Sequence, residues 1–197
     1  MRADEIEGVL AFLRAAERLK TVMRSGWTSE GQQESVAEHT WRLCLMAMLL
    51  YGGTAGVDLA RLLKMCLIHD LGEAIRGDVP APAQVAGAGK AEQERADLSE
   101  VTDSLPPGMQ QEILELWDEY EAADSTVARL AKGLDKLETI LQHTQGLNPD
   151  DFDYAYNLGY GQQYTAADPL LSALRARLDE ETARRANEGL SHPPAPA

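Results

Sequence analysis

The chain has 197 residues, of which 44% are hydrophobic and 25% charged, and its formal net charge is -14. This length and apolar content predict one folded domain and exclude a disordered chain. The acidic balance argues against a nucleic-acid polymer as a partner, because such a surface repels phosphate backbones. No apolar run approaches the roughly 20 residues that span a bilayer, and the N-terminus lacks the apolar centre of a signal peptide. We therefore expect a cytoplasmic protein with no membrane partner.

Apolar residues recur at helical spacing along the chain, and no segment shows the alternation of a strand. The pattern predicts an all-α domain over residues 1–187, followed by a disordered, proline-rich tail over 188–197. In chain order, the expected helices span residues 4–22, 36–51, 59–77, 90–104, 107–121, 126–145 and a last helix from 169.

Capping residues support several of these helix starts. Ser35 and Glu38 have the spacing of a capping box, in which each side chain satisfies a free backbone N–H of the other residue. The other starts are marked by an N-cap residue or by proline in the first turn, at Asp58, Pro107, Ser125 and Asp168-Pro169.

The helix over 59–77 is apolar around most of its circumference, so we expect it to be the central and most buried one. The segments between helices are predicted as loops. The proline- and glycine-rich segment 77–89 either shapes a site or is a plain surface loop. Cys44 and Cys66 lack C-x-x-C spacing and lie in apolar runs, which predicts buried thiols without a disulfide.

The run MCLIHDLGE places His69, Asp70 and Glu73 within five residues at the end of this most apolar helix. Burying these ionisable groups without partners costs several kcal/mol each, and a divalent cation is one partner that could offset the cost. His39 also lies in an apolar helix. A lone histidine on a helix is more often a core or surface residue than a metal ligand.

His39, His69-Asp70 and Asp135 follow one another in the order H…HD…D, and with this pattern the chain resembles the HD-domain metal-dependent phosphohydrolases. The resemblance covers about residues 10–180 and implies a single HD-domain helical bundle, those four residues as metal ligands, and a homodimer. Flanking motifs are similar to the branch of the bacterial 5'-deoxynucleotidase and its eukaryotic HD-domain relatives: RSGW (24–27), ESVAEHTWR (34–42), LIHDLGEAIRGDVP (67–80), LWDEYE (116–121), DKLE (135–138) and NLGYGQQYT (157–165).

Two imidazoles and two carboxylates form a mixed nitrogen and oxygen donor set without a thiolate. Such a set favours an octahedral ion such as Mn²⁺, Fe²⁺ or Co²⁺ over a closed structural zinc site, with Mg²⁺ and Zn²⁺ as alternatives. Four protein ligands leave positions for water and a phosphate oxygen, as a hydrolytic metal site requires.

Glu73 lies four residues after His69, on the same face if the helix continues that far. A carboxylate there could orient or deprotonate the attacking water, and the plain alternative is a surface glutamate at a helix end. The resemblance implies a catalytic role for Glu73. It also implies an active-site position for Asp78, in substrate contact or proton transfer, where the alternative is a turn residue before proline.

Arg24 offers a planar fork for a phosphate and Trp27 a flat face for a sugar or base, although either could be structural. Arg76 is a second candidate for the phosphate. His143 is expected on a helix surface. The remaining large side chains of interest are expected to pack between helices: Trp41, Trp117, Met46, Met48 and Met65.

The resemblance implies an enzyme, a 5'-deoxynucleotidase that hydrolyses 2'-deoxyribonucleoside 5'-monophosphates to deoxynucleoside and phosphate. One alternative is an HD-type phosphohydrolase acting on a triphosphate, a cyclic nucleotide or a hyperphosphorylated nucleotide. Another is a catalytically silent HD domain that binds a nucleotide. The complete ligand set together with Glu73 argues against a silent domain.

Overall fold

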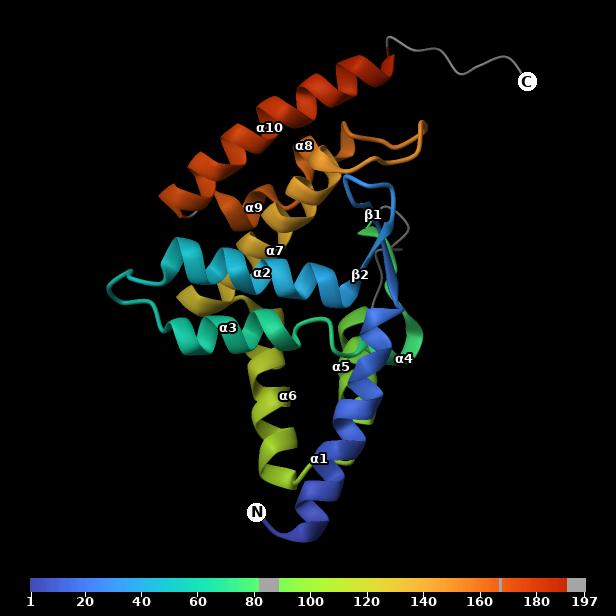
Figure 1. Ribbon diagram of the computed structural model, residues 1–197. Helices are drawn as coiled ribbons and strands as arrows, with labels where there is room; N and C mark the ends of the chain where they lie inside the picture. Colours follow the sequence, from blue (N-terminus) through green and yellow to red (C-terminus); the bar gives the residue numbers. More distant parts are fainter. Residues whose placement is uncertain (82–88, 167, 191–197) are drawn as a thin grey trace, which may run out of the picture.

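The computed structural model describes residues 1–81, 89–166 and 168–190, and helices dominate these ranges (Figure 1). The expected all-α class is confirmed, with one small sheet as a local exception. In chain order the elements are α1 (Ala3–Ala16), the 3₁₀-helix η1 (Glu17–Lys20), β1 (Met23–Trp27), β2 (Gln33–Ser35), α2 (Val36–Tyr51), α3 (Leu59–Ile68), α4 (Glu73–Arg76), α5 (Lys90–Val101), α6 (Pro107–Ala122), α7 (Thr126–Gln145), α8 (Tyr156–Gly159), α9 (Gln162–Thr165) and α10 (Pro169–Leu190).

The predicted helix starts are confirmed by their capping hydrogen bonds. The backbone N–H of Ser35 donates to the Glu38 carboxylate at 2.7 Å, and the N–H of Glu38 donates to Ser35 Oγ at 3.3 Å. The side chains of Asp58 and Ser125 each accept a hydrogen bond from the first turn of α3 and α7. Asp168 Oδ1 accepts two backbone N–H groups at the start of α10.

The expected loop after the first helix contains an antiparallel hairpin instead. β1 pairs with β2, with Met23 opposite Ser35 and Trp27 opposite Gln33, and the register shifts between these pairs. Gly31, at φ 79°, forms the turn. Strand β1 was not apparent in the sequence because MRSGW does not alternate apolar and polar residues.

The predicted helix over 59–77 is wrong in its length. α3 ends at Ile68, and tight turns follow in which the N–H of Leu71 bonds Ile68 O and that of Glu73 bonds Asp70 O. Gly72 explains the break in part, because a Cβ there would lie 3.1 Å from Glu94 O and 3.2 Å from Leu98 N of α5. The turn therefore brings the chain against the backbone of another helix.

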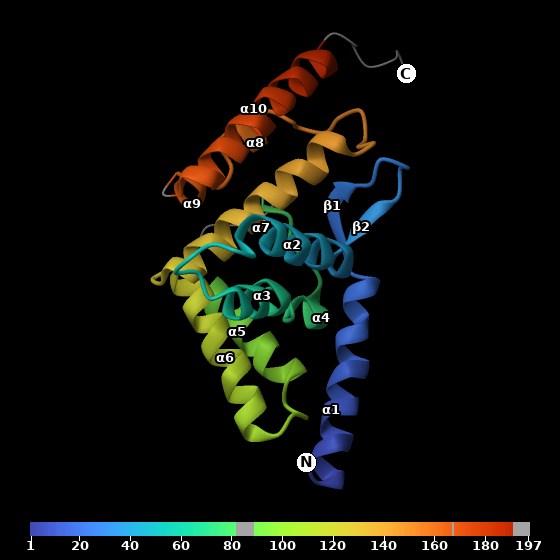
Figure 2. The same cartoon turned by 60° about the vertical axis from the view of Figure 1, so that its left-hand side comes forward.

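The central helix is α7, and the expectation that residues 59–77 form the most buried helix is also wrong. α7 lies among the other helices and packs against α2, α3, α6, α10 and β1 (Figures 1 and 2). Most of its side chains are buried. Leu67 of α3, by contrast, is exposed. A helix apolar on every side thus lies nearer the surface than one that carries charged residues into the site.

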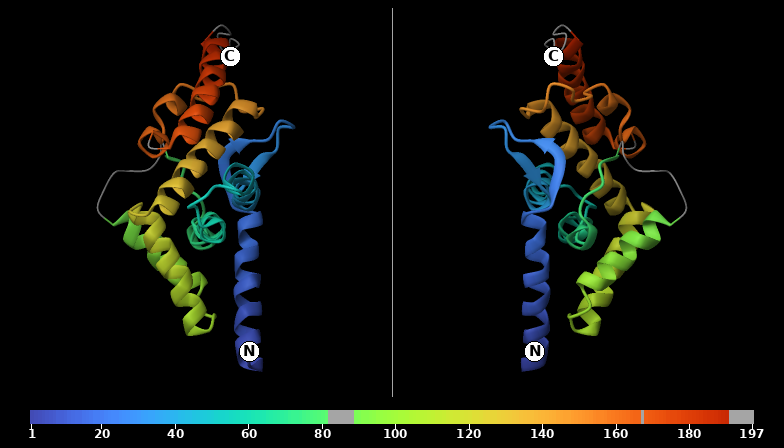
Figure 3. Two further views of the ribbon diagram at one scale, coloured as in Figure 1. Left: turned by 90° about the vertical axis from the view of Figure 1, so that its left-hand side faces the viewer. Right: turned by 90° about the vertical axis from the view of Figure 1, so that its right-hand side faces the viewer.

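The two ends of the chain lie at opposite ends of the molecule, with α1 at one and α10 at the other (Figure 3). α1 ends at Ala16, before the expected boundary at residue 22, and η1 continues the segment. α10 extends to Leu190, three residues past the expected end of the domain at 187. The remainder of the expected tail, and residues 82–88 of the expected loop, lie outside the described residues.

Side-chain burial departs from expectation at two positions on α2. Trp41 is 67% exposed, and Met48 is exposed as well, so neither packs between helices as expected. Trp117 and Met65 are buried in the core, and Cys44 and Cys66 are free thiols, Cys44 half-buried and Cys66 buried. In the part of the chain that the structure describes, none of the helices combines the length and apolar content that a bilayer crossing needs.

Candidate active site

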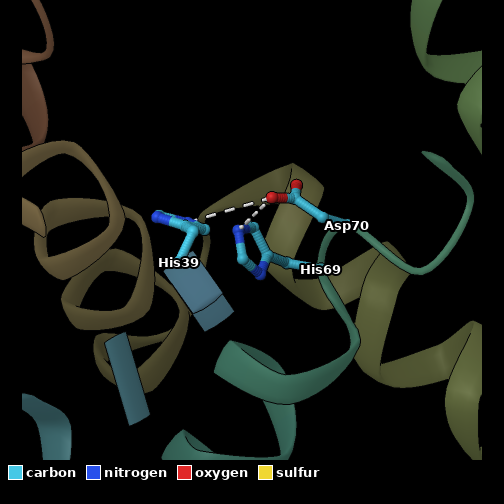
Figure 4. A group of neighbouring side chains, drawn as sticks. All are labelled: His39, His69 and Asp70. Atoms are coloured by element: carbon cyan, nitrogen blue, oxygen red, sulfur yellow. Dashed lines mark ion pairs between the residues drawn. The ribbon is translucent and has the colours of Figure 1, made fainter. Parts of the chain in front are cut away.

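Four side chains from three parts of the fold converge beside α7. His39 comes from α2, and His69 and Asp70 come from the turn between α3 and α4 (Figure 4). Asp135 comes from the middle of α7. His39 Nε2 lies 3.4 Å from Asp135 Oδ1 and 3.9 Å from Asp70 Oδ2. His69 Nε2 lies 3.0 Å from Asp70 Oδ2 and 3.8 Å from Asp135 Oδ1. The residues predicted as metal ligands thus share one centre.

The two imidazoles are oriented by hydrogen bonds on their outer nitrogens. His69 Nδ1 lies 2.8 Å from Cys66 O, and His39 Nδ1 contacts the Glu138 carboxylate. Because a carbonyl and a carboxylate only accept, each Nδ1 carries the hydrogen and each Nε2 faces the centre. Both Nε2 atoms are buried and make no hydrogen bond to any described residue. Two such nitrogens between two carboxylates fit a divalent cation.

The electrostatics of the centre favour positive charge. Burial and Arg24 lower the pKa of His39, but Glu138 and Asp135 outweigh them and raise it to about 9. Burial opposes ionisation of Asp70, yet His69 and Arg24 hold its pKa at about 2. In the absence of a cation, a proton on His39 therefore supplies part of the missing charge.

Asp135 is fixed by two groups that the sequence did not single out. Its Oδ2 accepts hydrogen bonds from Tyr120 Oη at 3.0 Å and from Lys136 Nζ at 2.8 Å. Its Oδ1 remains for the histidine side of the centre. Burial opposes the ionised form, but Lys136 and His39 hold the pKa of Asp135 well below its usual range.

Glu73 and Asp78 line a cavity of about 820 Å³ that opens beside the four residues. The turn after His69, and not a continuation of α3, brings Glu73 to the cavity. The expectation that one helix carries both His69 and Glu73 is therefore wrong. Glu73 Oε2 is buried and makes no hydrogen bond to any residue in the described ranges. Burial, with Asp70 and Asp78 nearby, raises the pKa of Glu73 to about 10. The pKa of Asp78 is raised by burial, while a hydrogen bond with Glu73 acts against this.

Arg24 enters the same cavity from β1. Its Nη1 lies 3.4 Å from Asp70 Oδ2, its Nε lies 3.4 Å from Glu34 Oε2, and its Nη2 donates to Thr139 Oγ1 at 3.0 Å. These contacts hold the guanidinium in one place, and the pKa of Arg24 is raised because the nearby carboxylates outweigh burial. The arginine is thus fixed beside Asp70, at the cavity edge of the cluster.

The other two residues predicted to bind substrate are placed less favourably. Trp27 is not among the described residues that line the cavity. Its backbone N–H donates to Asn148 Oδ1 at 3.2 Å, and its carbonyl accepts from Gln142. Arg76 lines the cavity, but its Nε pairs with Asp97 at 2.9 Å and its side chain is largely exposed.

His143 is buried, so the expectation of a surface position is wrong. It packs edge-on against Phe152 and its Nδ1 lies 3.1 Å from Asn157 Oδ1, while burial lowers its pKa to about 4. A signal for this position was present in the sequence, because His143 follows Asp135 by eight residues and so shares its face of α7. Thr139, four residues after Asp135, is likewise expected on this face of α7.

A second group of potential donors lies behind His39, consisting of Glu34, His39 and Glu138. Arginines already neutralise it. Arg42 Nε lies 2.6 Å from Glu138 Oε1, and Arg42 Nη2 lies 3.7 Å from Glu34 Oε1. We therefore assign this group to the support of His39 and place no ion there.

Comparison with known proteins places these residues in a wider context. A family model described as HD domain matches residues 16–175. The protein named 5'-deoxynucleotidase HDDC2 of Danio rerio is 37% identical over 139 residues, which are 70% of this chain and 68% of that protein. Its namesake of Homo sapiens is 35% identical over 139 residues, 70% and 67% of the two chains. A crystal structure described as a predicted metal-dependent phosphohydrolase from Magnetospirillum magnetotacticum MS-1 has 28% identity and a TM-score of 0.74, covering 93% of this chain and 98% of that one.

Proposed function

The chain belongs to the HD domain family, and we propose that it is a metal-dependent 5'-deoxynucleotidase. It hydrolyses 2'-deoxyribonucleoside 5'-monophosphates to deoxynucleoside and inorganic phosphate. The observation that carries the proposal is the pair of buried Nε2 atoms of His39 and His69, which make no hydrogen bond to a described residue and face two carboxylates beside a cavity. The names of relatives that are 35% and 37% identical to the chain over 139 residues support the substrate class.

His39, His69, Asp70 and Asp135 would hold the divalent cation, and their donor set favours Mn²⁺, Fe²⁺ or Co²⁺. When bound, such an ion supplies a Lewis acid that draws charge from the phosphoryl group and makes water a stronger acid. The proposal also includes a small nucleotide as the substrate, no nucleic-acid polymer, and a homodimer as the assembly.

Arg24 binds the phosphate in this scheme. Its guanidinium is already held at the cavity by Glu34, Asp70 and Thr139, so little side-chain freedom is lost when a phosphate oxygen binds.

Glu73 accepts the proton of the attacking water. It is neutral in the cation-free site, and added positive charge favours the ionised form that can act as a base. Asp78 shares a hydrogen bond with Glu73 and thereby positions its carboxyl group.

Phosphate release from a panel of ribo- and deoxyribonucleotides tests the proposal, with each nucleotide assayed with Mn²⁺, Co²⁺, Fe²⁺, Zn²⁺ and Mg²⁺. We expect activity that a chelator abolishes, and a higher kcat/KM for dAMP than for AMP. Equal values for the two would indicate a general nucleotidase. Release of pyrophosphate or triphosphate from nucleoside triphosphates, without turnover of monophosphates, would overturn the proposal.

A further inference from the structure

Four aromatic residues recur at every fourth position in the segment that carries α8 and α9, and all four line the cavity. This aromatic wall consists of Phe152, Tyr156, Tyr160 and Tyr164. The segment lies beside α7 and α10 (Figures 1 and 2). Three of the four proposed metal ligands, His69, Asp70 and Asp135, line the same cavity together with Arg24.

The rings of the wall differ in what covers them. Lys136 Nζ lies 5.2 Å from the centroid of the Tyr160 ring, and Lys132 Nζ lies 5.5 Å from that of Tyr164. The rings of Tyr156 and Tyr160 pack in a tilted arrangement, with a centroid distance of 5.7 Å and an interplanar angle of 32°. Tyr156 is 39% exposed, whereas the other three rings are half-buried. An aromatic ring this exposed inside a cavity has surface left for a ligand.

Asn157, the next residue, also lines the cavity and carries a buried amide donor. It is only 1% exposed, and its Oδ1 lies 3.1 Å from Nδ1 of His143. His143 is neutral at pH 7. Because the amide oxygen of Asn157 only accepts, Nδ1 of His143 carries the hydrogen. Asn157 Nδ2 is left without a hydrogen-bond partner among the residues that the structure describes. A buried amide donor without a partner is unfavourable, and a ligand acceptor would remove that cost.

We infer that the aromatic wall and Asn157 form the subsite for the nucleobase, with the base stacked on Tyr156 and one of its acceptor atoms bonded to Asn157 Nδ2. The inference rests on the proposed function, because it assumes a nucleotide in the cavity. At about 820 Å³ the cavity has room for more than a phosphate group. The charges near the cluster of metal ligands serve the phosphate, so the aromatic side of the cavity serves the apolar part of the substrate.

This chemistry predicts weak discrimination between bases. Every base has an aromatic face, and stacking on a ring is tolerant of sequence. Purine N3 and pyrimidine O2 are acceptors common to all four bases, and a single N–H donor can bond either atom. The subsite therefore separates nucleotides from other phosphate esters and does not select one base.

The test compares substrates that differ only in the base. The ratio of kcat/KM for dAMP to that for 2-deoxyribose 5-phosphate measures what the base contributes, and dCMP replaces dAMP in a second series. Tyr156→Leu and Asn157→Asp are each expected to lower both ratios by about tenfold, mainly through KM. Stacking on one aromatic ring is typically worth about 5- to 150-fold, and an unmade hydrogen bond of a buried group about 5- to 150-fold as well. Asn157→Asp keeps the shape but replaces the donor by an acceptor.

Trp41→Leu is the matched control, because Trp41 is an exposed aromatic residue of α2 outside the cavity lining. Thermal unfolding checks that each variant is folded, and Tyr156→Leu removes an exposed ring, so the test does not depend on Asn157→Asp alone. Unchanged ratios in folded Tyr156→Leu would overturn the inference. So would an equal loss with 2-deoxyribose 5-phosphate, which would place these residues at the sugar or phosphate. If the wild type hydrolyses no deoxynucleotide, the proposed function fails instead.

Discussion

The two sides of the metal-ligand cluster differ in how their charges are satisfied. On the inner side, away from the cavity lining, the Glu138 carboxylate contacts both His39 Nδ1 and Arg42 Nε. On the cavity side, Glu73 has a buried oxygen with no hydrogen bond within the described ranges, and burial raises its pKa and that of Asp78.

The difference indicates a division of labour. The inner side is complete in the protein itself, so it sets the geometry of the ligands before anything binds. The cavity side holds carboxyl groups whose ionised form the protein alone disfavours, so a bound cation would complete it. Substitutions on the inner side should therefore affect folding and metal affinity, and those on the cavity side should affect turnover.

The largest effect is expected from the ligands. Asp70→Ala should abolish tightly bound metal and phosphate release and leave a folded protein, because Asp70 lies at the cavity edge. His39→Ala should also abolish both, and in addition destabilise the fold by about 2 kcal/mol or more, since it leaves Glu138 buried with one partner fewer. Elemental analysis, activity and chemical unfolding measure the three quantities.

Asp103→Ala, at an exposed carboxylate, is the control for these two variants. Full metal content in Asp70→Ala would remove Asp70 from the ligand set. Equal stability of His39→Ala and the wild type in a chelator would contradict the division of labour.

The second effect concerns Glu73 on the cavity side. Glu73→Gln should retain the metal and lower kcat by ~10²–10⁴, the usual range for loss of a general acid or base. Metal content and kcat are measured on the same preparation, with Glu100→Gln at an exposed position as the matched control. Loss of the metal would make Glu73 a ligand or its support, and an unchanged kcat would return it to a structural role.

A smaller effect is expected on the inner side, at Glu138. Glu138→Gln keeps the shape but loses the charge that orients His39 and increases its basicity, so the Kd for Mn²⁺ should rise roughly 10- to 100-fold. Calorimetric titration of the metal-free protein measures it, and Glu115→Gln on the exposed face of α6 is the control. The same Kd in both variants would mean that Glu138 serves only the fold.

The smallest effect is a pH dependence of stability at His143, a buried group on α7. Its pKa is lowered to about 4 in the folded state, so the unfolded chain binds a proton first as the pH falls below about 6.5. His143 should therefore remove about 2 kcal/mol of stability between pH 7 and pH 5. In His143→Gln this part of the loss should be absent. Chemical unfolding of both proteins in a chelator measures the difference, and parallel curves would contradict the burial of a neutral imidazole.

The residues proposed as ligands could be singled out because their order and flanking motifs are local features of the sequence. The capping residues Ser35, Asp58 and Ser125 could be predicted for the same reason. The break after His69 could not, because it depends on how closely the backbone of α5 approaches Gly72. Partners such as Tyr120 were missed since they matter only through a neighbour from another helix.

Burial also depended on the rest of the fold. An apolar pattern placed Trp41 between helices, yet the described residues leave it exposed, whereas His143 is covered by Phe152 and Asn157. Periodicity identifies the faces of a helix but not which face another segment covers. The face of α7 that carries Asp135 and Thr139 illustrates this, because it is polar and nevertheless buried.

The proposed ligands come from α2, the turn after α3, and α7, so the unfolded chain, in which these segments are far apart, has no assembled site. A cation that binds the native state alone shifts the folding equilibrium by mass action, by about 2.7 kcal/mol when its free concentration is 100 times Kd. It does so by joining three segments that are otherwise held by packing. Metal supply would then govern how much of the protein is folded as well as how fast it works, and a metal-starved cell would hold a less stable population of the same chain.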